Sequence, residues 1–425
     1  YESFYNMQVP RSIDKLGLLS AEQYKEIYSK INPTSNLFPG GEFRDFAYRG
    51  PSGRGVANAG DPAVDPSLYK LDPRNPANNY LITKLIKTGS SNAYDEIMNP
   101  ALMMQHNITA SGGTDRATYL VSFGYLDHQG TLENTSLKRY NVRVNSQVKV
   151  RENIRIGENL NIYYKNNPNV TPINGGFGPI QGAISTPPFL PLYDIQGNYA
   201  GPFVGPTDEL GDWGNPKASA DLVSNNRRRE YGMQGNAYLE IDFLRHFTAR
   251  TSFGGTINNF YVQQYSPSQY WSRNGAGNDV LTESSGFATT YQWTNTLQYK
   301  NQFGKHNLSV LVGSEAIETS ARTLNGGGEK YFLNSYEYLV LGNSGVFRNP
   351  SSTGAATSLF SLLGRADYSY NDRYLLAVSG RRDGYSEFGP DSKYGNFYSV
   401  SVGWRLSEEE FMQNVSWIND LKLRA

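Results

Sequence analysis

The sequence predicts an all-β protein, an antiparallel up-and-down β-barrel that spans a membrane, and three observations support this prediction. Aromatic residues make up 13% of the 425 residues and charged residues only 18%, whereas a soluble domain usually carries about a quarter charged residues. Segments in which apolar and polar residues alternate recur along the chain. The connections between them are alternately short and long, as in barrels with short periplasmic turns and longer outer loops.

The alternation is clearest between Tyr140 and Val150, where apolar side chains fall on one face and polar side chains on the other. Successive side chains of a strand point to opposite sides, so this segment has one surface for lipid and one for the lumen. The residues expected to face lipid are Tyr119, Val121, Phe123, Val142, Val144, Val148, Val400, Val402 and Trp404. The residues expected to face the lumen are Arg143, Asn145, Gln147, Gln234, Asn236, Glu240, Gln292, Thr294, Arg365 and Asp367.

The same pattern divides 105–425 into successive barrel hairpins. The predicted strands are 1–9, 105–111, 116–126, 138–150, 154–165, 230–243, 247–263, 285–300, 306–321, 356–371, 373–384 and 395–407, and a further strand begins near 418. The long connections 166–229, 264–284, 322–355 and 385–394 are expected to be outer loops, with Gly326-Gly327-Gly328 as flexible loop. Because an open sheet edge leaves backbone groups unpaired in lipid, we expect further polypeptide to close the barrel.

The region 10–104 is expected to be a long extracellular loop, rich in Pro, Gly and Asn, that contains one short helix. The helix is predicted from Ser20 to Ile31. Ser20 can cap its first turn, and Gln23 stands where a capping box requires a glutamine or glutamate.

Composition disfavours several classes of function. Lys and Arg balance Asp and Glu at 39 each, so there is no electrostatic case for nucleic acid. Cysteine is absent, which excludes thiolate catalysis, disulfides and cysteine-based zinc sites. The histidines show no metal-ligand spacing, and no catalytic triad or carboxylate pair can be traced to one place. We therefore expect no enzymatic activity, no metal and no cofactor.

A set of ordered segments is recognisable along the chain. They are 107–115 (NITASGGTD), 117–130 (ATYLVSFGYLDHQG), 138–145 (KRYNVRVN), 156–161 (IGENLN), 363–376 (LGRADYSYNDRYLL), 381–390 (RRDGYSEFGP), 400–408 (VSVGWRLSE) and 421–425 (LKLRA). These segments resemble the SusC/RagA family of TonB-dependent transporters from the outer membranes of Bacteroidetes. The loops 32–90, 166–229 and 322–355 carry no such resemblance.

The resemblance implies a barrel of about 22 strands around an N-terminal plug. This chain would be a partial receptor barrel domain, 1–425, that lacks the plug and the final strands. The implied function is active import of an oligosaccharide or oligopeptide across the outer membrane of a Gram-negative, Bacteroidetes-like cell. The implied partners are outer-membrane lipid, a SusD-like surface lipoprotein, and the TonB–ExbB–ExbD complex, which acts through the plug and its TonB box. A dimer of transporter–lipoprotein pairs is also implied.

Substrate-binding residues are expected in the outer loops, where aromatic faces can stack on sugar or peptide groups beside polar side chains. The candidates are Tyr193, Asp194, Phe203, Asp212, Trp213, Tyr270, Trp271 and Arg273. The alternative is that these rings pack the loops against one another. Arg227-Arg228-Arg229, near the outer rim, could bind lipopolysaccharide phosphates, or could simply be solvated.

Other functions remain open on the sequence. A passive porin or an adhesin barrel has the same strand pattern, and an upstream plug with a TonB box would exclude it. A barrel-embedded hydrolase requires a nucleophile and a base at the lumen mouth. A soluble carbohydrate-binding β-protein would not need detergent.

Overall fold

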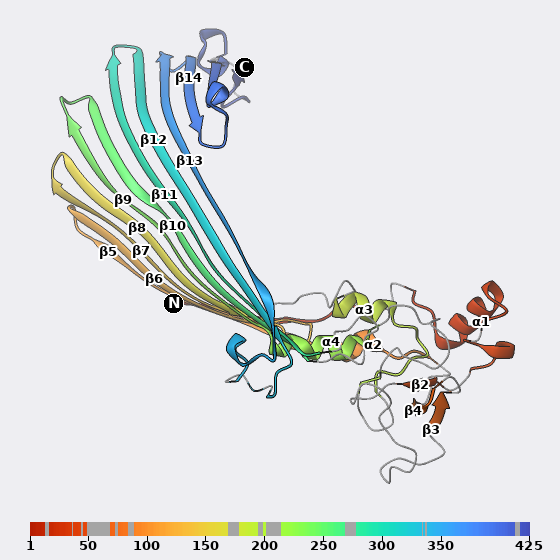
Figure 1. Cartoon of the computed structure of the whole chain (residues 1–425). Coiled ribbons are helices and arrows are strands. Elements are labelled where there is room, and N and C mark those ends of the chain that lie inside the picture. Colours follow the sequence, from red (N-terminus) through yellow and green to blue (C-terminus); the bar gives the residue numbers. More distant parts are fainter. Residues whose placement is uncertain are drawn as a thin grey trace.

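A computed structural model of the protein describes residues 1–12, 17–35, 37–43, 46–48, 69–72, 75–83, 89–168, 178–193, 199–200, 214–267, 278–333, 335, 338–412 and 417–425. Most of them form one sheet of 13 strands (Figure 1). Its strands are β1 (Glu2–Gln8), β5 (Ala101–Gly113), β6 (Ala117–Gln129), β7 (Ser136–Arg151), β8 (Ile154–Asn167), β9 (Arg227–Phe243), β10 (Phe247–Ser266), β11 (Val280–Phe303), β12 (His306–Glu329), β13 (Val346–Tyr370), β14 (Tyr374–Tyr385), β15 (Tyr394–Arg405) and β16 (Lys422–Arg424).

The sheet is an antiparallel up-and-down meander. From β5 to β16 each strand pairs with the next one along the chain, and β1 pairs with β5. Among the described strands, β1 and β16 stand at the two edges, so the sheet is open. Figure 1 shows the short turns at one end of the sheet and the helices with a small second sheet at the other end. The predicted up-and-down β architecture is confirmed.

Two of the short turns are made by pairs of residues in the left-handed conformation. Leu244 and Arg245 have φ of 49° and 60° between β9 and β10, and Asn371 and Asp372 have φ of 51° and 54° between β13 and β14. Asn and Asp tolerate this conformation better than other non-glycine residues do. Such turns reverse the chain within a few residues, so the neighbouring strands stay in register.

The strands next to the long loops are longer than the sequence predicted. β11 and β12 each have 24 residues and β13 has 25, whereas a tilted strand crosses a bilayer with about 9–11 residues. The expectation of a flexible loop at Gly326-Gly327-Gly328 is wrong, because these glycines belong to β12 and pair with β11. A Cβ at Gly328 would lie 2.5 Å from the Cβ of Ser344, so glycine here allows a loop to pack directly on the strand.

The helices and the small sheet lie in the two longest connections. The helices are α1 (Ala21–Ile31), α2 (Ala93–Ile97), α3 (Pro179–Ser185) and α4 (Pro216–Leu222). Short 3₁₀ segments are Pro39–Gly41, Val223–Asn225, Leu341–Asn343, Pro390–Ser392, Leu406–Glu408 and Glu410–Met412. The small sheet has the order β2-β4-β3, from Phe46–Tyr48, Asn75–Thr83 and Tyr69–Asp72. The sequence predicted only α1, because the other helices have 5 to 7 residues, which is too short to show a helical period.

Two small apolar cores hold these elements. Ala21 of α1 is buried with Leu37, Phe38, Phe189 and Leu190. The second core joins α2, α3 and α4 through Ala93, Ile97, Leu132, Ala183, Leu192 and Ala220. The region at the long-loop end of the sheet therefore has packed interiors of its own.

The predicted capping box of α1 is present. Gln23 N–H donates to Ser20 Oγ at 3.3 Å, and Ser20 N–H donates to Gln23 Oε1 at 2.9 Å. We expect Ser20→Ala to destabilise α1 locally by about 1 kcal/mol, because one amide loses its partner. Hydrogen exchange of the first-turn amides measures this loss, and unchanged exchange in the variant would contradict it.

Candidate functional site

The two faces of the main sheet differ in chemistry, and the strand register shows which residues share a face. Val144 pairs with Val121 on β6 and with Leu160 on β8. Asn145, the next residue, pairs with Asn159, which pairs with Asn236 on β9. Followed across all strands, the register places the residues expected to face lipid on one side, here called the apolar face. It places those expected to face the lumen on the opposite side, the polar face.

A cavity of about 520 Å³ lies on the polar face across β7 to β11. It brings together Arg143, Asn145, Gln234, Asn236, Gln292 and Thr294, all of which the sequence singled out. The Nδ2 of Asn159 donates to Asn236 Oδ1 at 3.2 Å, and the Nδ2 of Asn236 donates to Ser252 Oγ at 3.1 Å. The lining is thus a row of amides and hydroxyls, in which Arg143 is the one charged residue.

Ion pairs connect the strands of the polar face beside this cavity. Arg155 on β8 contacts Glu240 and Asp242 on β9, each at 2.6 Å. Arg381 on β14 contacts Glu315 on β12 at 2.8 Å. The alternation of the sequence places Glu240 and Asp242 on the polar side of their strand, but it did not single out Arg155, Glu315 or Arg381.

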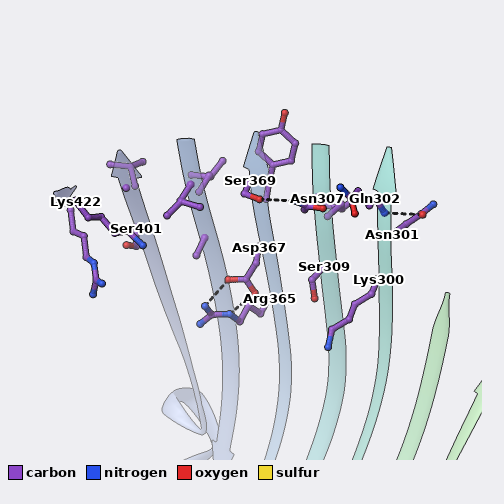
Figure 2. A pocket seen from close by; sticks show the side chains of 18 of the residues that line it. Lys300, Asn301, Gln302, Asn307, Ser309, Arg365, Asp367, Ser369, Ser401 and Lys422 are labelled. Carbon is purple, nitrogen blue, oxygen red and sulfur yellow. Dashed lines mark hydrogen bonds and ion pairs between the residues drawn. The ribbon is translucent and has the colours of Figure 1, made fainter. Parts of the chain in front are cut away.

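The remaining predicted polar-face residues also have partners. Gln147 accepts a hydrogen bond from the hydroxyl of Tyr238 at 3.0 Å. Arg365 and Asp367, two residues apart on β13, form an ion pair at 2.6 Å. They line a second hollow of about 820 Å³ near the short turns, together with Lys300 (Figure 2). This end of the polar face is therefore richer in charge than the cavity.

Carboxylates such as Glu158 on β8 and Glu318 on β12 break the alternation, and Glu318 pairs with Tyr291 on the apolar face. Glu158 lies on the apolar face, where it pairs with Ser146 on β7 and with Ala237 on β9. The hydroxyl of Ser146 donates to Glu158 Oε2 at 2.6 Å, which satisfies one acceptor of this group.

A second candidate region is the cluster of α2, α3 and α4. Lys217 Nζ lies 2.7 Å from both Glu133 and Asp221, and the Lys217 side chain is only 12% exposed. Burial acts to lower the pKa of Lys217, but its hydrogen bonds to the two carboxylates outweigh burial and raise it. Burial, and then a hydrogen bond to Asp221, raises the pKa of Tyr199.

Tyr193 is the one loop candidate that lies within the described part of the chain. Its hydroxyl donates to Glu96 of α2 at 3.2 Å, and its ring stacks on Tyr199 at 6.1 Å between centroids. Burial, and then Glu96, raises the pKa of Tyr193. This ring therefore packs loop against helix. The other candidates, Asp194, Phe203, Asp212, Trp213, Tyr270, Trp271 and Arg273, lie outside the described residues.

The described residues contain neither a cluster of metal ligands nor a helix that could span a membrane. No group of three or more His, Asp or Glu side chains could hold a metal ion. None of the described helices is long and apolar enough to cross a bilayer.

No family model matches the chain. It is 28% identical over 344 residues to TonB-dependent receptor P26 of Formosa agariphila, which is 78% of this chain and 33% of that protein. It is 25% identical over 358 residues to TonB-dependent receptor SusC of Bacteroides thetaiotaomicron, which is 79% of this chain and 34% of that protein. The chain thus spans about a third of the length of these relatives.

The fold matches solved structures of a RagAB peptide importer. In the "closed-closed" state the TM-score is 0.75 at 18% identity, over 99% of this chain and 46% of that chain. In the "open-open" state the TM-score is 0.76 at 18% identity, over 99% and 45%. The relatives are named as receptors and an importer, not as enzymes. The chain is thus SusC/RagA-like: its sequence is similar to part of these TonB-dependent receptors, and its open up-and-down sheet has the fold of part of the RagAB importer.

Proposed function

We propose that this chain forms part of the wall and outer mouth of an energised importer that carries an oligosaccharide or an oligopeptide. The polar face borders the lumen, and the apolar face contacts lipid. The region 10–104 and the helical cluster stand on the extracellular side, and the short turns on the periplasmic side. The cavity on the polar face is the observation that carries this proposal.

The cavity suits uncharged, hydrogen-bonding ligands. Amides such as those of Asn145 and Gln292 both donate and accept hydrogen bonds. Sugar hydroxyls and peptide amides do the same, so either substrate class can move along such a wall without being held by charge. Transport of the substrate makes and breaks no covalent bond. It requires only that the substrate binds and that a path through the barrel then opens.

The partners in this proposal are those that the resemblance to the SusC/RagA family implies. A SusD-like surface lipoprotein closes the outer mouth, and TonB–ExbB–ExbD displaces a plug inside the barrel. Two transporter–lipoprotein pairs form a dimer. The helical cluster of α2, α3 and α4, which has its own core, forms part of the surface that contacts the SusD-like lipoprotein.

Uptake of a labelled oligosaccharide or oligopeptide by whole cells tests the proposal. In the full-length protein, the double substitution Asn145→Ala and Gln292→Ala should lower the uptake rate about three- to tenfold, because two hydrogen-bonding groups of the wall are lost. Thr289→Ala, on the apolar face of β11, is the control and should leave uptake unchanged.

Energy dependence separates this function from the alternative of a passive pore. Uptake through the full-length protein should stop when TonB is deleted. Uptake that continues at the same rate without TonB would show a porin-like barrel instead.

A further inference from the structure

The outer part of the apolar face has three tiers of different chemistry on β7, β8 and β9. The lowest tier is aliphatic: Val142 pairs with Ile162, and Ile162 with Met233. The next tier is Tyr140, Tyr164 and Tyr231, paired in the same order. The third tier, nearest the long loops, is Lys138, Asn166 and Arg229.

The two lower tiers form a groove that is open to the membrane. Its volume is about 410 Å³, and Ile257 of β10 closes one side. The tyrosine rings contact one another, with centroids 6.2 Å apart for Tyr140 and Tyr164 and 4.8 Å apart for Tyr164 and Tyr231. Tyrosine at this position marks the level of lipid headgroups, so the aliphatic tier lies at the level of acyl chains.

The third tier carries two positive charges, of which the protein itself pairs only that of Lys138 within the described part of the chain. Arg228 lies on the polar face, where it pairs with Glu230 at 3.5 Å. Arg229 lies on the apolar face, and its side chain has no ion pair or hydrogen bond within the described part of the chain. Lys138 is 3.5 Å from Asp127 and remains 46% exposed.

We propose that this surface binds the phosphorylated, acylated glycolipid of the outer leaflet. Arg229 and Lys138 hold the phosphates, the tyrosine tier supports the sugar, and an acyl chain lies in the groove. The planar guanidinium of Arg229 can donate two hydrogen bonds to one phosphate, which an ammonium group cannot do in the same fixed geometry. From the long loops toward the middle of the strands, the surface presents positive charge, then tyrosine rings, then the aliphatic groove. The glycolipid presents its phosphates, its sugar and its acyl chains in the same order. This inference is independent of the nutrient that the barrel carries.

Native mass spectrometry of the full-length protein, extracted from outer membranes, tests the site. The wild type should retain the bisphosphorylated glycolipid, and Arg229→Gln should retain about tenfold less, because a charged hydrogen bond to phosphate is lost. Lys138→Gln should retain about threefold less, because Lys138 already has Asp127 as a partner. Arg229→Lys should fall between Arg229→Gln and the wild type.

Arg322→Gln is the matched control. Arg322 is also an arginine on the apolar face, but it lies on β12, away from the three tiers. This variant should retain lipid as the wild type does. Equal retention by Arg229→Gln and the wild type, or an equal loss in Arg322→Gln, would overturn the proposal.

Reloading the delipidated protein identifies the ligand. The glycolipid should bind, and its dephosphorylated form should bind at least tenfold more weakly. Phosphatidylglycerol that competed equally well would show a site for any anionic lipid and would refute the assignment to the glycolipid. If Arg229→Gln fails to assemble, as judged by heat-modifiable migration, then Lys138→Gln and Arg229→Lys decide the question.

Discussion

Val144→Arg should reduce the stability of the full-length barrel in a bilayer by about 2–4 kcal/mol. Val144 lies on the apolar face between Val121 and Leu160, four residues along β7 from Tyr140 of the tyrosine tier. Arginine at that depth must either leave its charge in hydrocarbon or distort the bilayer to reach water. Urea titration of the protein folded into lipid vesicles measures the loss.

The neighbouring position provides the control. Asn145→Arg places the same side chain on the polar face, in the cavity of about 520 Å³. There the charge can remain hydrated, so the variant should differ from the wild type by less than about 1 kcal/mol. Equal losses at the two positions would mean that the faces have been assigned wrongly, because one residue along a strand changes only the side.

The strands and their faces could be predicted because they depend on local alternation. Each predicted strand corresponds to one in the structure, and a residue's face depends only on whether its position is odd or even along the strand. The outer part of β12 could not be predicted, because Gly326 to Gly328 have no side chains to alternate. Its regular structure depends on pairing with β11, which the sequence of β12 does not contain.

The contacts of the candidate site were harder to predict than its faces. Glu315 and Arg381 are 66 residues apart in sequence, and Tyr193 and Glu96 are 97 apart. Such pairs require the register of several strands and the packing of short helices, neither of which periodicity supplies. Alternation therefore identifies the surface on which a residue lies, but not the residue that it contacts.

Asn215→Leu should have the largest effect on the helical cluster, at about 3 kcal/mol, because four hydrogen bonds depend on one buried amide. Asn215 is 0% exposed and precedes α4. Its Oδ1 accepts from the backbone N–H of Lys217 at 3.0 Å and of Ala218 at 3.1 Å. Its Nδ2 donates to the carbonyls of Leu192 at 2.7 Å and Ala200 at 2.9 Å. Leucine fills a similar space but removes all four hydrogen bonds, and among the described residues only the carbonyl of Leu192 keeps another partner, the backbone N–H of Ala200 at 2.9 Å.

Asn92, which precedes α2, is the matched control. It is also an asparagine at a helix N-cap, but its side chain makes no capping hydrogen bond, and its φ of 50° suits glycine. Asn92→Gly should therefore change stability by less than about 0.5 kcal/mol, or should stabilise the cluster slightly. Hydrogen exchange of the α4 amides compares the two variants, and similar exchange in both would contradict the role given to Asn215. If the cluster forms part of the outer mouth, Asn215→Leu should also slow uptake while leaving the strands of the barrel folded, because the cluster can open locally without the sheet.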